Sequence, residues 1–325
     1  MSDAYRMIAR APGGPEVIER EEIAPPAPGP GEIRIRNQAV GLNFIDVYHR
    51  TGLYPMPLPI TLGREAAGVV DAVGEGVDDF VPGDRVAYFA KHGSYASHAI
   101  ANPAQTYALP DALDAETAAA ALLKGLTTWM LVERIARVAP GQHVLVHAAA
   151  GGVGSIAVQW LKAAGARVIA HSGSPDKAAI ATRLGADVSL HGPLEDLGAA
   201  VREATDGRGV EAVLDGVGKA SWEASLSSVA KRGIIVSYGN ASGPVPPVAP
   251  LALGRAGSVF LVRPSVFDWI DRPGEGEAAW ARVSDLLTSG AVRIEIGQHF
   301  ALNDAAEAHR ALEARETTGA TVLVP

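Results

Sequence analysis

Residues 143–174 read HVLVHAAAGGVGSIAVQWLKAAGARVIAHSGS, and their order of apolar, glycine-rich and polar segments predicts a strand, a turn, a helix and a second strand. Residues 144–146 are a short apolar run, as expected for a strand buried on both faces of a parallel sheet. The helix is expected to begin at Ser155 and to end at Gly165, which suits a left-handed cap. The second strand is expected over residues 166–170.

The turn inside this segment has the spacing of a dinucleotide-binding fingerprint. Ala149, Gly151 and Gly154 occupy its three small-residue positions. Gly151 would let the backbone approach a pyrophosphate, and Gly154 would let the helix pack closely on the strand. The helix N-terminus would direct free N–H groups toward the phosphates. Glycine turns also form ordinary loops, but the strand before and the capped helix after this one favour a dinucleotide site.

Length and composition restrict the class of protein. A chain of 325 residues suggests two domains. The net charge of −8 argues against a protein that binds nucleic acid through phosphate contacts. The chain has no cysteine, which excludes disulfides, thiolate nucleophiles and cysteine-ligated zinc. No apolar run is long enough to span a membrane and the first residues show no signal core, so a cytoplasmic protein is expected.

The two ends of the chain differ in pattern from its middle. Residues 1–123 show many short alternating segments punctuated by glycine and proline, which predicts a β-rich domain, and residues 267–325 return to this style. We expect strands at residues 5–9, 17–22, 32–40, 65–73, 85–90, 94–101, 105–109, 294–300 and 320–324, with helices at 277–288 and 305–314.

Residues 124–266 alternate between strand and helix patterns, which predicts a doubly wound parallel sheet and an α/β fold class. A helix capped by Ser174, with Pro175 in its first turn, should end at Gly185. Beyond it we expect strands at residues 187–190, 210–214, 234–238 and 258–262, and helices at 194–204 and 221–230.

Together these segments resemble a family, the zinc-free medium-chain dehydrogenases/reductases, and within it the NADPH:quinone oxidoreductases related to ζ-crystallin. The resemblance covers almost the whole chain. It implies a GroES-like catalytic domain built from residues 1–123 and 267–325, a Rossmann NADPH-binding domain over 124–266, and a homodimer joined through residues 258–262. The segments that carry it are GLNFIDVYHRTGLYP (41–55), GREAAGVV (63–70), PGDRV (82–86), LLKGLTTWMLV (122–132), HAAAGGVG (147–154), VSYGNASG (236–243), SVFLVRPS (258–265) and TGATVLVP (318–325).

We expect no metal site. The zinc-dependent branch of the family would have a cysteine near Asn43 and a histidine near Arg64, and this chain has neither. The histidines at positions 98, 147, 171 and 191 are scattered, without the spacing of a ligand pair. Without a Lewis acid to stabilise an alkoxide, a quinone is a better hydride acceptor than an alcohol is a donor.

The residues after the second strand favour NADPH over NADH. NAD-binding proteins carry an acid there that binds the ribose 2′-hydroxyl and would repel a phosphate. Here Ser174 can donate to a phosphate and Lys177 supplies positive charge, with Arg183 and His191 as further contacts. The alternative makes Ser174 only a helix cap and Lys177 only a solvated charge, and Asp176 counts against NADPH.

By resemblance, Asn43, Tyr48 and Tyr54 surround the nicotinamide and the acceptor. The Asn43 amide can donate to a carbonyl oxygen on which charge develops, and Tyr48 can donate a proton or hydrogen bond to the product oxygen. The alternatives are that Asn43 is a helix N-cap and that the tyrosines lie at the rim of a core. Asp46 is expected to make a structural hydrogen bond.

The expected cofactor contacts extend along both the crossing helix and the strand ends. Gly239 and Asn240 follow a strand and should line the groove at its carboxyl end. By resemblance, the full set that holds NADPH is Asn43, Lys124, Thr127, Ala150, Gly151, Gly152, Val153, Gly154, Ser172, Gly173, Ser174, Lys177, His191, Val217, Tyr238, Gly239, Asn240 and Arg263.

The sequence therefore predicts a zinc-independent reductase that transfers hydride from NADPH to a small electron-poor acceptor, most simply a quinone. An NADPH-dependent reductase of enoyl or 2-alkenal C=C bonds remains an alternative. A second alternative is a non-catalytic crystallin-like protein that binds NADPH or RNA, against which the acidic net charge argues. Neither nucleic acid nor membrane is an expected partner.

Overall fold

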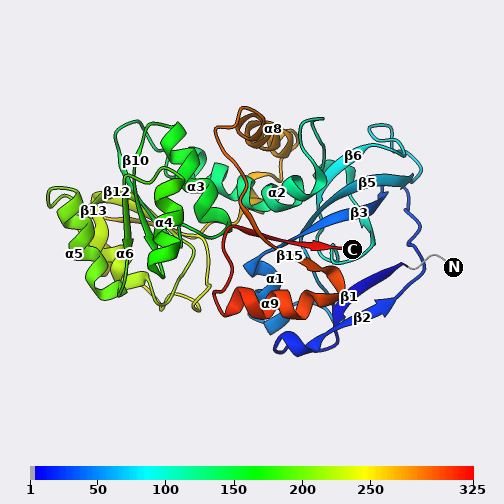
Figure 1. The fold of residues 1–325 in the computed structure, drawn as a ribbon, viewed down its shortest axis with the longest axis horizontal. Coiled ribbons are helices and arrows are strands. Elements are labelled where there is room, and N and C mark those ends of the chain that lie inside the picture. The colour runs from blue at the N-terminus through cyan, green and yellow to red at the C-terminus, as the bar shows by residue number, and fades with distance from the viewer. Residues whose placement is uncertain (1–3) are drawn as a thin grey trace. The chain divides into compact units, whose positions relative to one another are not determined.

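The computed structural model describes residues 4–325, which form two compact units (Figure 1). The first, called the β-rich unit, contains the chain up to Leu123 together with Gly276–Ser284 and Ile294–Pro325. The second, called the α/β unit, contains Lys124–Glu275 and Asp285–Arg293. Each unit has a hydrophobic core of its own.

The β-rich unit is built on a seven-stranded sheet in the order β15-β16-β3-β5-β6-β8, with β7 also paired to β3, and a three-stranded sheet β2-β1-β4. The C-terminal strand β16 pairs antiparallel with β3, and β15 pairs parallel with β16. In β3 the isoleucines at 33 and 35 are buried in the core, as the alternation of the sequence predicts. The strands are β1 (Tyr5–Ala9), β2 (Ile18–Glu22), β3 (Ile33–Leu42), β4 (Ile60–Thr61), β5 (Glu65–Val73), β6 (Arg85–Phe89), β7 (His98–Ala101), β8 (Thr106–Ala108), β15 (Ile296–Ala301) and β16 (Ala320–Val324).

The α/β unit has a six-stranded, wholly parallel sheet in the order β11-β10-β9-β12-β13-β14, which is the doubly wound Rossmann arrangement. Its central strand β9 carries Val144, Leu145 and Val146, all without solvent exposure, as predicted for a strand covered on both faces. The strands are β9 (His143–His147), β10 (Arg167–Ser172), β11 (Val188–His191), β12 (Val210–Asp215), β13 (Val229–Ser237) and β14 (Phe260–Val262).

The helices follow the strand alternation. Because the order of the strands reverses on either side of β9, the crossings through α3 and α4 lie on one face of the sheet and that through α6 on the other, where α5 and α6 pack together (Figure 1). The helices are α1 (Phe44–Thr51), α2 (Ala115–Trp129), α3 (Gly152–Ala163), α4 (Pro175–Arg183), α5 (Leu194–Ala204), α6 (Trp222–Ser228), α7 (Pro250–Arg255), α8 (Glu275–Thr288) and α9 (Ala305–Glu313).

Several predicted boundaries were wrong, and the largest difference is that β13 begins at Val229 and not at residue 234. The strand expected over residues 94–101 begins only at His98, because the backbone of Tyr95 and Ser97 bonds instead to the short three-stranded part of the unit. The helix expected over 221–230 ends at Ser228, because Val229 already pairs with β12. Helix α3 begins at Gly152 rather than at Ser155, so the glycine turn itself forms its first turn.

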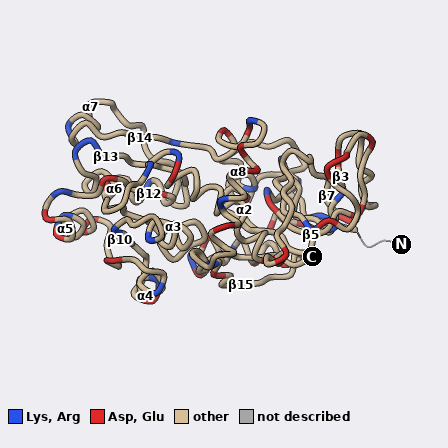
Figure 2. Tube along the Cα trace, turned by 90° about the horizontal axis from the view of Figure 1, so that it is seen from above, with Lys and Arg blue, Asp and Glu red and all other residues tan. Residues whose placement is uncertain are grey.

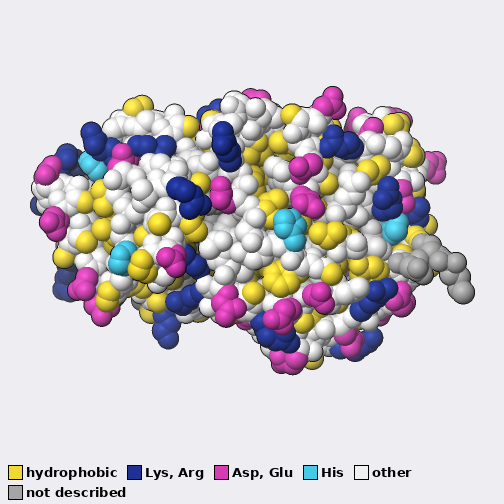
Figure 3. Space-filling view, viewed as in Figure 1, with side chains coloured by type: hydrophobic (Ala, Val, Ile, Leu, Met, Phe, Trp, Pro, Cys, Tyr) yellow, Lys and Arg dark blue, Asp and Glu magenta, His cyan; other side chains and the backbone are white. Residues whose placement is uncertain are grey.

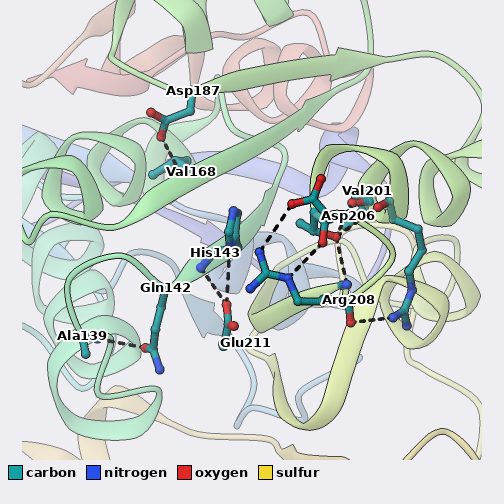
Figure 4. A network of polar contacts seen from close by, with 12 residues as sticks. Ala139, Gln142, His143, Val168, Asp187, Val201, Asp206, Arg208 and Glu211 are labelled. Carbon is teal, nitrogen blue, oxygen red and sulfur yellow. Dashed lines mark hydrogen bonds and ion pairs between the residues drawn. The ribbon is translucent and has the colours of Figure 1, made fainter.

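The amino ends of the parallel strands are held by side chains (Figure 4). Glu211 of β12 accepts the backbone N–H of His143 at 2.7 Å, and Asp187 accepts that of Val168 at 2.7 Å. Asp187 is also paired with Lys162 at 2.8 Å. Because these donors and acceptors pair with one another, we assign the side chains at the amino ends of the strands a structural role.

Acidic and basic residues are interspersed along the trace of both units (Figure 2). On the face drawn in Figure 3, hydrophobic side chains lie dispersed among polar and charged ones. Within residues 4–325, none of the helices combines the length and the hydropathy needed to cross a bilayer.

Candidate functional site

The glycine turn connects β9 to α3 at the carboxyl edge of the parallel sheet. Gly151 is the N-cap of α3, and its carbonyl accepts the N–H of Ser155 at 2.8 Å. The N–H groups of the three residues between them therefore have no partner within the helix and point out of its end. A Cβ on Gly154 would lie 2.3 Å from the carbonyl oxygen of Ala148, so only glycine lets α3 pack this closely on the turn. Ala150, Gly152 and Val153 belong to the same turn.

A second group of predicted residues lies at the ends of β10 and β11. Ser172 ends β10 and is paired in register with His191, which ends β11. The hydroxyl of Ser172 is buried and has no hydrogen-bond partner among residues 4–325. A Cβ on the following Gly173 would meet nothing within 4 Å, so the chain is open to one side at this point.

Helix α4 begins directly after this opening. The Ser174 hydroxyl accepts the backbone N–H of Lys177 at 3.3 Å, so Ser174 is the N-cap predicted from the sequence. Lys177 is half-buried in the first turn, whereas Asp176 and Arg183 are exposed. The structure thus brings Ser172, Ser174 and Lys177 into one short segment, with a helix N-terminus that favours anions.

Behind the glycine turn, the strand ends share a buried polar network. The carboxylate of Asp215 accepts the hydroxyls of Ser221 at 2.7 Å and Ser225 at 2.6 Å. Because Ser225 donates to the carboxylate, its oxygen must accept the Nε2–H of His147, which lies at 3.0 Å. Burial lowers the pKa of His147 to about 4, so its imidazole is neutral.

This network has the residue types of a hydrolytic triad but not its order. In a triad the serine gives its proton to histidine, whereas Ser225 gives its proton to Asp215 and is fully buried. His171, the last residue but one of the neighbouring strand β10, stands edge-on to His147 with ring centroids 5.8 Å apart. We therefore assign this network a structural role at the strand ends that precede the glycine turn and the loop after β12.

The loops after β12 and β13 lie against each other. Asp215 also accepts the backbone N–H of Val217 at 2.9 Å, and its own carbonyl accepts the N–H of Tyr238 at 2.8 Å. A Cβ on Gly239 would lie 2.3 Å from the carbonyl oxygen of Gly216. Asn240 follows in the same loop.

Arg263, just past β14, is exposed and donates to the carbonyl of Ser237 at 2.9 Å, so it too stands at the carboxyl edge. Lys124 and Thr127 lie on α2 rather than at a strand end, the first almost buried and the second half-buried.

The residues present fit a phosphorylated dinucleotide. A pyrophosphate needs close backbone approach at a helix N-terminus, which the turn from Gly151 to Gly154 provides. The buried Ser172 hydroxyl lacks a hydrogen-bond partner within residues 4–325, and the next residue, Gly173, is open on the side where a Cβ would lie. Strand β10 does not end in an acidic residue, and Lys177 lies in the first turn of the helix that follows it.

In the β-rich unit, the three residues expected around the acceptor lie together on and after α1. Asn43 is the N-cap of α1, as one of the two interpretations of its sequence position predicted. Tyr48 is buried, and its ring meets that of Tyr54 edge-on with centroids 5.2 Å apart. The Tyr54 backbone N–H donates to the Tyr48 carbonyl at 3.0 Å, which fixes the loop after the helix.

The side chain of Asn43 is held by a residue that the sequence did not single out. Its Nδ2 donates to Oε1 of Glu65 at 2.7 Å, and the backbone N–H of Leu123 donates to Oε2 at 2.6 Å. The only hint in the sequence is that Glu65 is a charged residue directly before the apolar run AAGVV at residues 66–70.

Asp46 makes the structural hydrogen bonds expected of it. Its Oδ2 accepts the Asn43 backbone N–H at 2.9 Å and the Tyr95 hydroxyl at 3.2 Å. The Tyr95 hydroxyl in turn lies 3.2 Å from Nε2 of His309 on α9. Burial raises the pKa of Tyr95 well above its usual range, so this phenol keeps its proton.

Basic groups flank the end of α1. Burial, with the nearby Arg64 guanidinium and His92, lowers the pKa of His49 to about 4. Burial also lowers the pKa of Arg64, and the Asp46 carboxylate opposes that shift.

Among residues 4–325, His, Cys, Asp and Glu side chains form no group of three that could hold a metal ion.

Comparison with known proteins adds independent findings. Residues 29–111 match the family model of the alcohol dehydrogenase GroES-like domain, and residues 152–264 match that of the zinc-binding dehydrogenases. A quinone oxidoreductase of Pseudomonas aeruginosa is 47% identical over 324 residues, covering 99% of this chain and 100% of its own.

Two further proteins are similar over nearly their whole length. The Escherichia coli quinone oxidoreductase, solved in complex with NADPH, has a TM-score of 0.95 and 41% identity, covering 99% of this chain and 100% of its own. A 2-haloacrylate reductase of a Burkholderia species is 37% identical over 322 residues, covering 96% of each chain.

Proposed function

Because this chain belongs to the quinone oxidoreductase family of medium-chain dehydrogenases/reductases, we propose that it reduces a quinone with NADPH. The observation that carries the cofactor is the strand-end segment of Ser172, Gly173, Ser174 and Lys177 beside the glycine turn. It combines a buried unpartnered hydroxyl, an open approach and a lysine, and no acid that would repel a 2′-phosphate. The NADPH complex of the E. coli relative supports the same cofactor.

The α/β unit binds the cofactor through residues at the carboxyl edge of its sheet. The backbone from Ala150 to Gly154 holds the pyrophosphate, with His191 beside the 2′-phosphate segment. The loops carrying Val217, Tyr238, Gly239 and Asn240 line the groove, and Lys124, Thr127 and Arg263 complete the proposed contacts. Residues 124–266 thus act as the nucleotide-binding domain, and residues 1–123 with 267–325 as the catalytic domain.

When bound, NADPH supplies a hydride, and with one proton this converts a quinone to a hydroquinone. The protein's task is to hold the acceptor and to exclude water. Asn43 presents a polar amide to the ligand, while the buried Tyr48 ring and the half-buried Tyr54 ring offer an aromatic surface and hydroxyls. The zinc-dependent branch is expected to have a cysteine near Asn43 and a histidine near Arg64, and the amide and guanidinium found here are not zinc ligands.

We also propose a homodimer formed through strand β14. This strand is one of the two edges of the parallel sheet, the other being β11, and Phe260 on it is 63% exposed. An exposed edge with a large apolar side chain is suited to pairing with a second copy. The cytoplasmic location expected from the sequence stays a prediction.

A second candidate function is the reduction of an activated C=C bond. The 2-haloacrylate reductase that resembles this chain favours it, because the same hydride donor and the same binding surface would serve an electron-poor alkene.

The test is the loss of NADPH absorbance with p-benzoquinone, run in parallel with NADH and corrected for the rate without protein. We expect rapid turnover that prefers NADPH. Turnover with a 2-enal or a 2-haloacrylate but not with the quinone would replace the proposed function by the second candidate. Binding of NADPH without turnover of either acceptor would overturn both.

A further inference from the structure

The contact between Asn43 and Glu65 is unusual because the Glu65 carboxylate is completely buried. Glu65 has no solvent exposure, and each of its carboxylate oxygens has a donor, Asn43 Nδ2 at 2.7 Å and the Leu123 N–H at 2.6 Å. An ionised carboxylate can only accept hydrogen bonds. The nitrogen of the Asn43 amide faces the Glu65 carboxylate, and its oxygen is turned toward the Asp46 N–H of the capping box, which fixes the orientation of an otherwise ambiguous side chain.

The surrounding strands are shaped to admit this carboxylate. Gly41 of β3 is the register partner of Glu65 on β5. A Cβ on Gly41 would lie 2.3 Å from Glu65 Oε1 and 2.4 Å from the carbonyl oxygen of Ala119. Any larger residue at position 41 would displace the carboxylate from Asn43.

A second buried carboxylate holds the backbone of the same residue. Asp46 is also without solvent exposure and accepts the Asn43 N–H at 2.9 Å. Asn43 is thus fixed both at its main chain and at its side chain. Burying a carboxylate costs several kcal/mol unless hydrogen bonds compensate. The hydrogen bond from the Leu123 N–H uses only one of the two Glu65 oxygens, so it does not account for the oxygen that accepts from Asn43.

We propose that Glu65 is a positioning residue that acts through Asn43. By taking one N–H of the amide, Glu65 leaves one N–H for a ligand, together with the second lone pair of the carbonyl oxygen Oδ1, whose first lone pair faces the Asp46 N–H in the capping box of α1. Donation to a carboxylate also polarises the amide and strengthens Oδ1 as an acceptor. Asn43 then acts chiefly as an oriented acceptor for a hydroxyl or amide N–H of the bound ligand. From the sequence we expected it to act as a donor to a carbonyl oxygen.

The identity of that ligand rests on the proposed function, but the hydrogen bond does not, so it can be tested without turnover. The chain has five asparagines, at positions 37, 43, 102, 240 and 303. Selective ¹⁵N-asparagine labelling therefore yields five side-chain amide pairs in an NMR spectrum, and Asn43→Ala assigns the pair of Asn43. We expect Glu65→Gln to shift this pair and to leave the other four in place.

Asp71→Asn is the matched control. It removes a carboxylate from the same strand β5, where Asp71 pairs with Arg34 of β3 at 2.8 Å. It adds a sixth labelled amide pair, its own, and should leave the Asn43 pair unchanged. Glu65→Asp, which keeps the charge but withdraws it from Asn43, serves if Glu65→Gln does not fold. An Asn43 pair that is unaffected in both Glu65 variants would overturn the proposal.

A double-mutant cycle tests whether Glu65 acts through Asn43 in the reaction. We expect Glu65→Gln to lower kcat roughly ten- to a hundredfold, the range for losing a hydrogen bond to a charged group, with a smaller change in KM. The double variant with Asn43→Ala should be no slower than Asn43→Ala alone. Additive losses would show that Glu65 acts independently of Asn43. A wild-type chain that turns over no quinone would overturn the proposed function and leave the NMR result standing.

Discussion

Ser174 and Lys177 lie in one short segment that has a structural role and to which we assign a binding role as well. The Ser174 hydroxyl caps α4 by accepting the Lys177 N–H at 3.3 Å, so replacing it would change helix stability as well as phosphate binding. The Lys177 side chain takes no part in that cap. Its replacement therefore isolates the charge, and Lys177 is the better probe of cofactor preference.

We predict that Lys177→Ala lowers kcat/KM for NADPH about ten- to a hundredfold and leaves that for NADH nearly unchanged. The reason is that a charge-assisted hydrogen bond to the 2′-phosphate is worth ~1.5–3 kcal/mol, and NADH lacks that phosphate. Steady-state kinetics with both nucleotides measures the ratio. Lys162→Ala is the control, because Lys162 pairs with Asp187 near the opposite edge of the same sheet. A parallel fall with NADH would contradict the prediction.

Helices α1 and α9, far apart in sequence, are joined by buried polar contacts. Arg50 of α1, almost fully buried, makes two 2.8 Å bonds to the Glu313 carboxylate of α9. His309, also on α9, is fully buried between Arg50 and Tyr95. Burial, with a smaller effect of the Arg50 charge, lowers the pKa of His309 to about 3.

This shift predicts a loss of stability in acid. In the unfolded chain His309 takes up a proton below its ordinary pKa of 6.5, whereas in the folded chain it does so only near pH 3. The free energy of unfolding therefore decreases as the pH is lowered across that interval. One such group contributes ~1.4 kcal/mol per pH unit.

Urea unfolding between about pH 6 and pH 4 should therefore show a slope lower by ~1.4 kcal/mol per pH unit in His309→Gln than in wild type. His299→Gln, which removes a histidine of the same unit with 49% of its side chain exposed, is the control for the loss of a histidine as such. Equal slopes in all three proteins would refute the assignment of a neutral His309.

At the scale of the whole molecule, the β14 edge of the parallel sheet is the feature that bears on assembly. Strand β14 pairs on one side only, with β13. Phe260 on this strand is 63% exposed, and Leu251 on the preceding helix α7 is 62% exposed. Both apolar side chains would be covered if the edge paired with a second copy.

We predict that Phe260→Glu converts the dimer to a monomer, because a charge on the pairing edge opposes burial. Light scattering after size-exclusion chromatography measures the mass. Val81→Glu is the matched control, since Val81 is a similarly exposed apolar residue of the β-rich unit. A wild-type chain that elutes as a monomer would sink the proposed dimer, and a variant that remains dimeric would remove β14 from it.

The amino-acid sequence alone determined the alternating organisation of the α/β unit and the place of the segment that we propose binds phosphate. Both depend on local patterns: buried parallel strands are continuous apolar runs, and the turn, the Ser174 cap and Lys177 lie within residues 147–177. The strand at residues 65–73 and the helix at 194–204 have the predicted bounds for the same reason.

Only the tertiary structure decided which residues hold the polar side chains in place. Glu65 meets Asn43 across 22 residues of chain, and Arg50 meets His309 across 259. No periodicity links such distant positions, because their pairing follows from sheet register and helix packing. The same holds for β16 beside β3, and for the network in which Asp215 and His147 share Ser225. Local propensity specifies elements, whereas burial of charge is satisfied only by partners that the completed fold brings together.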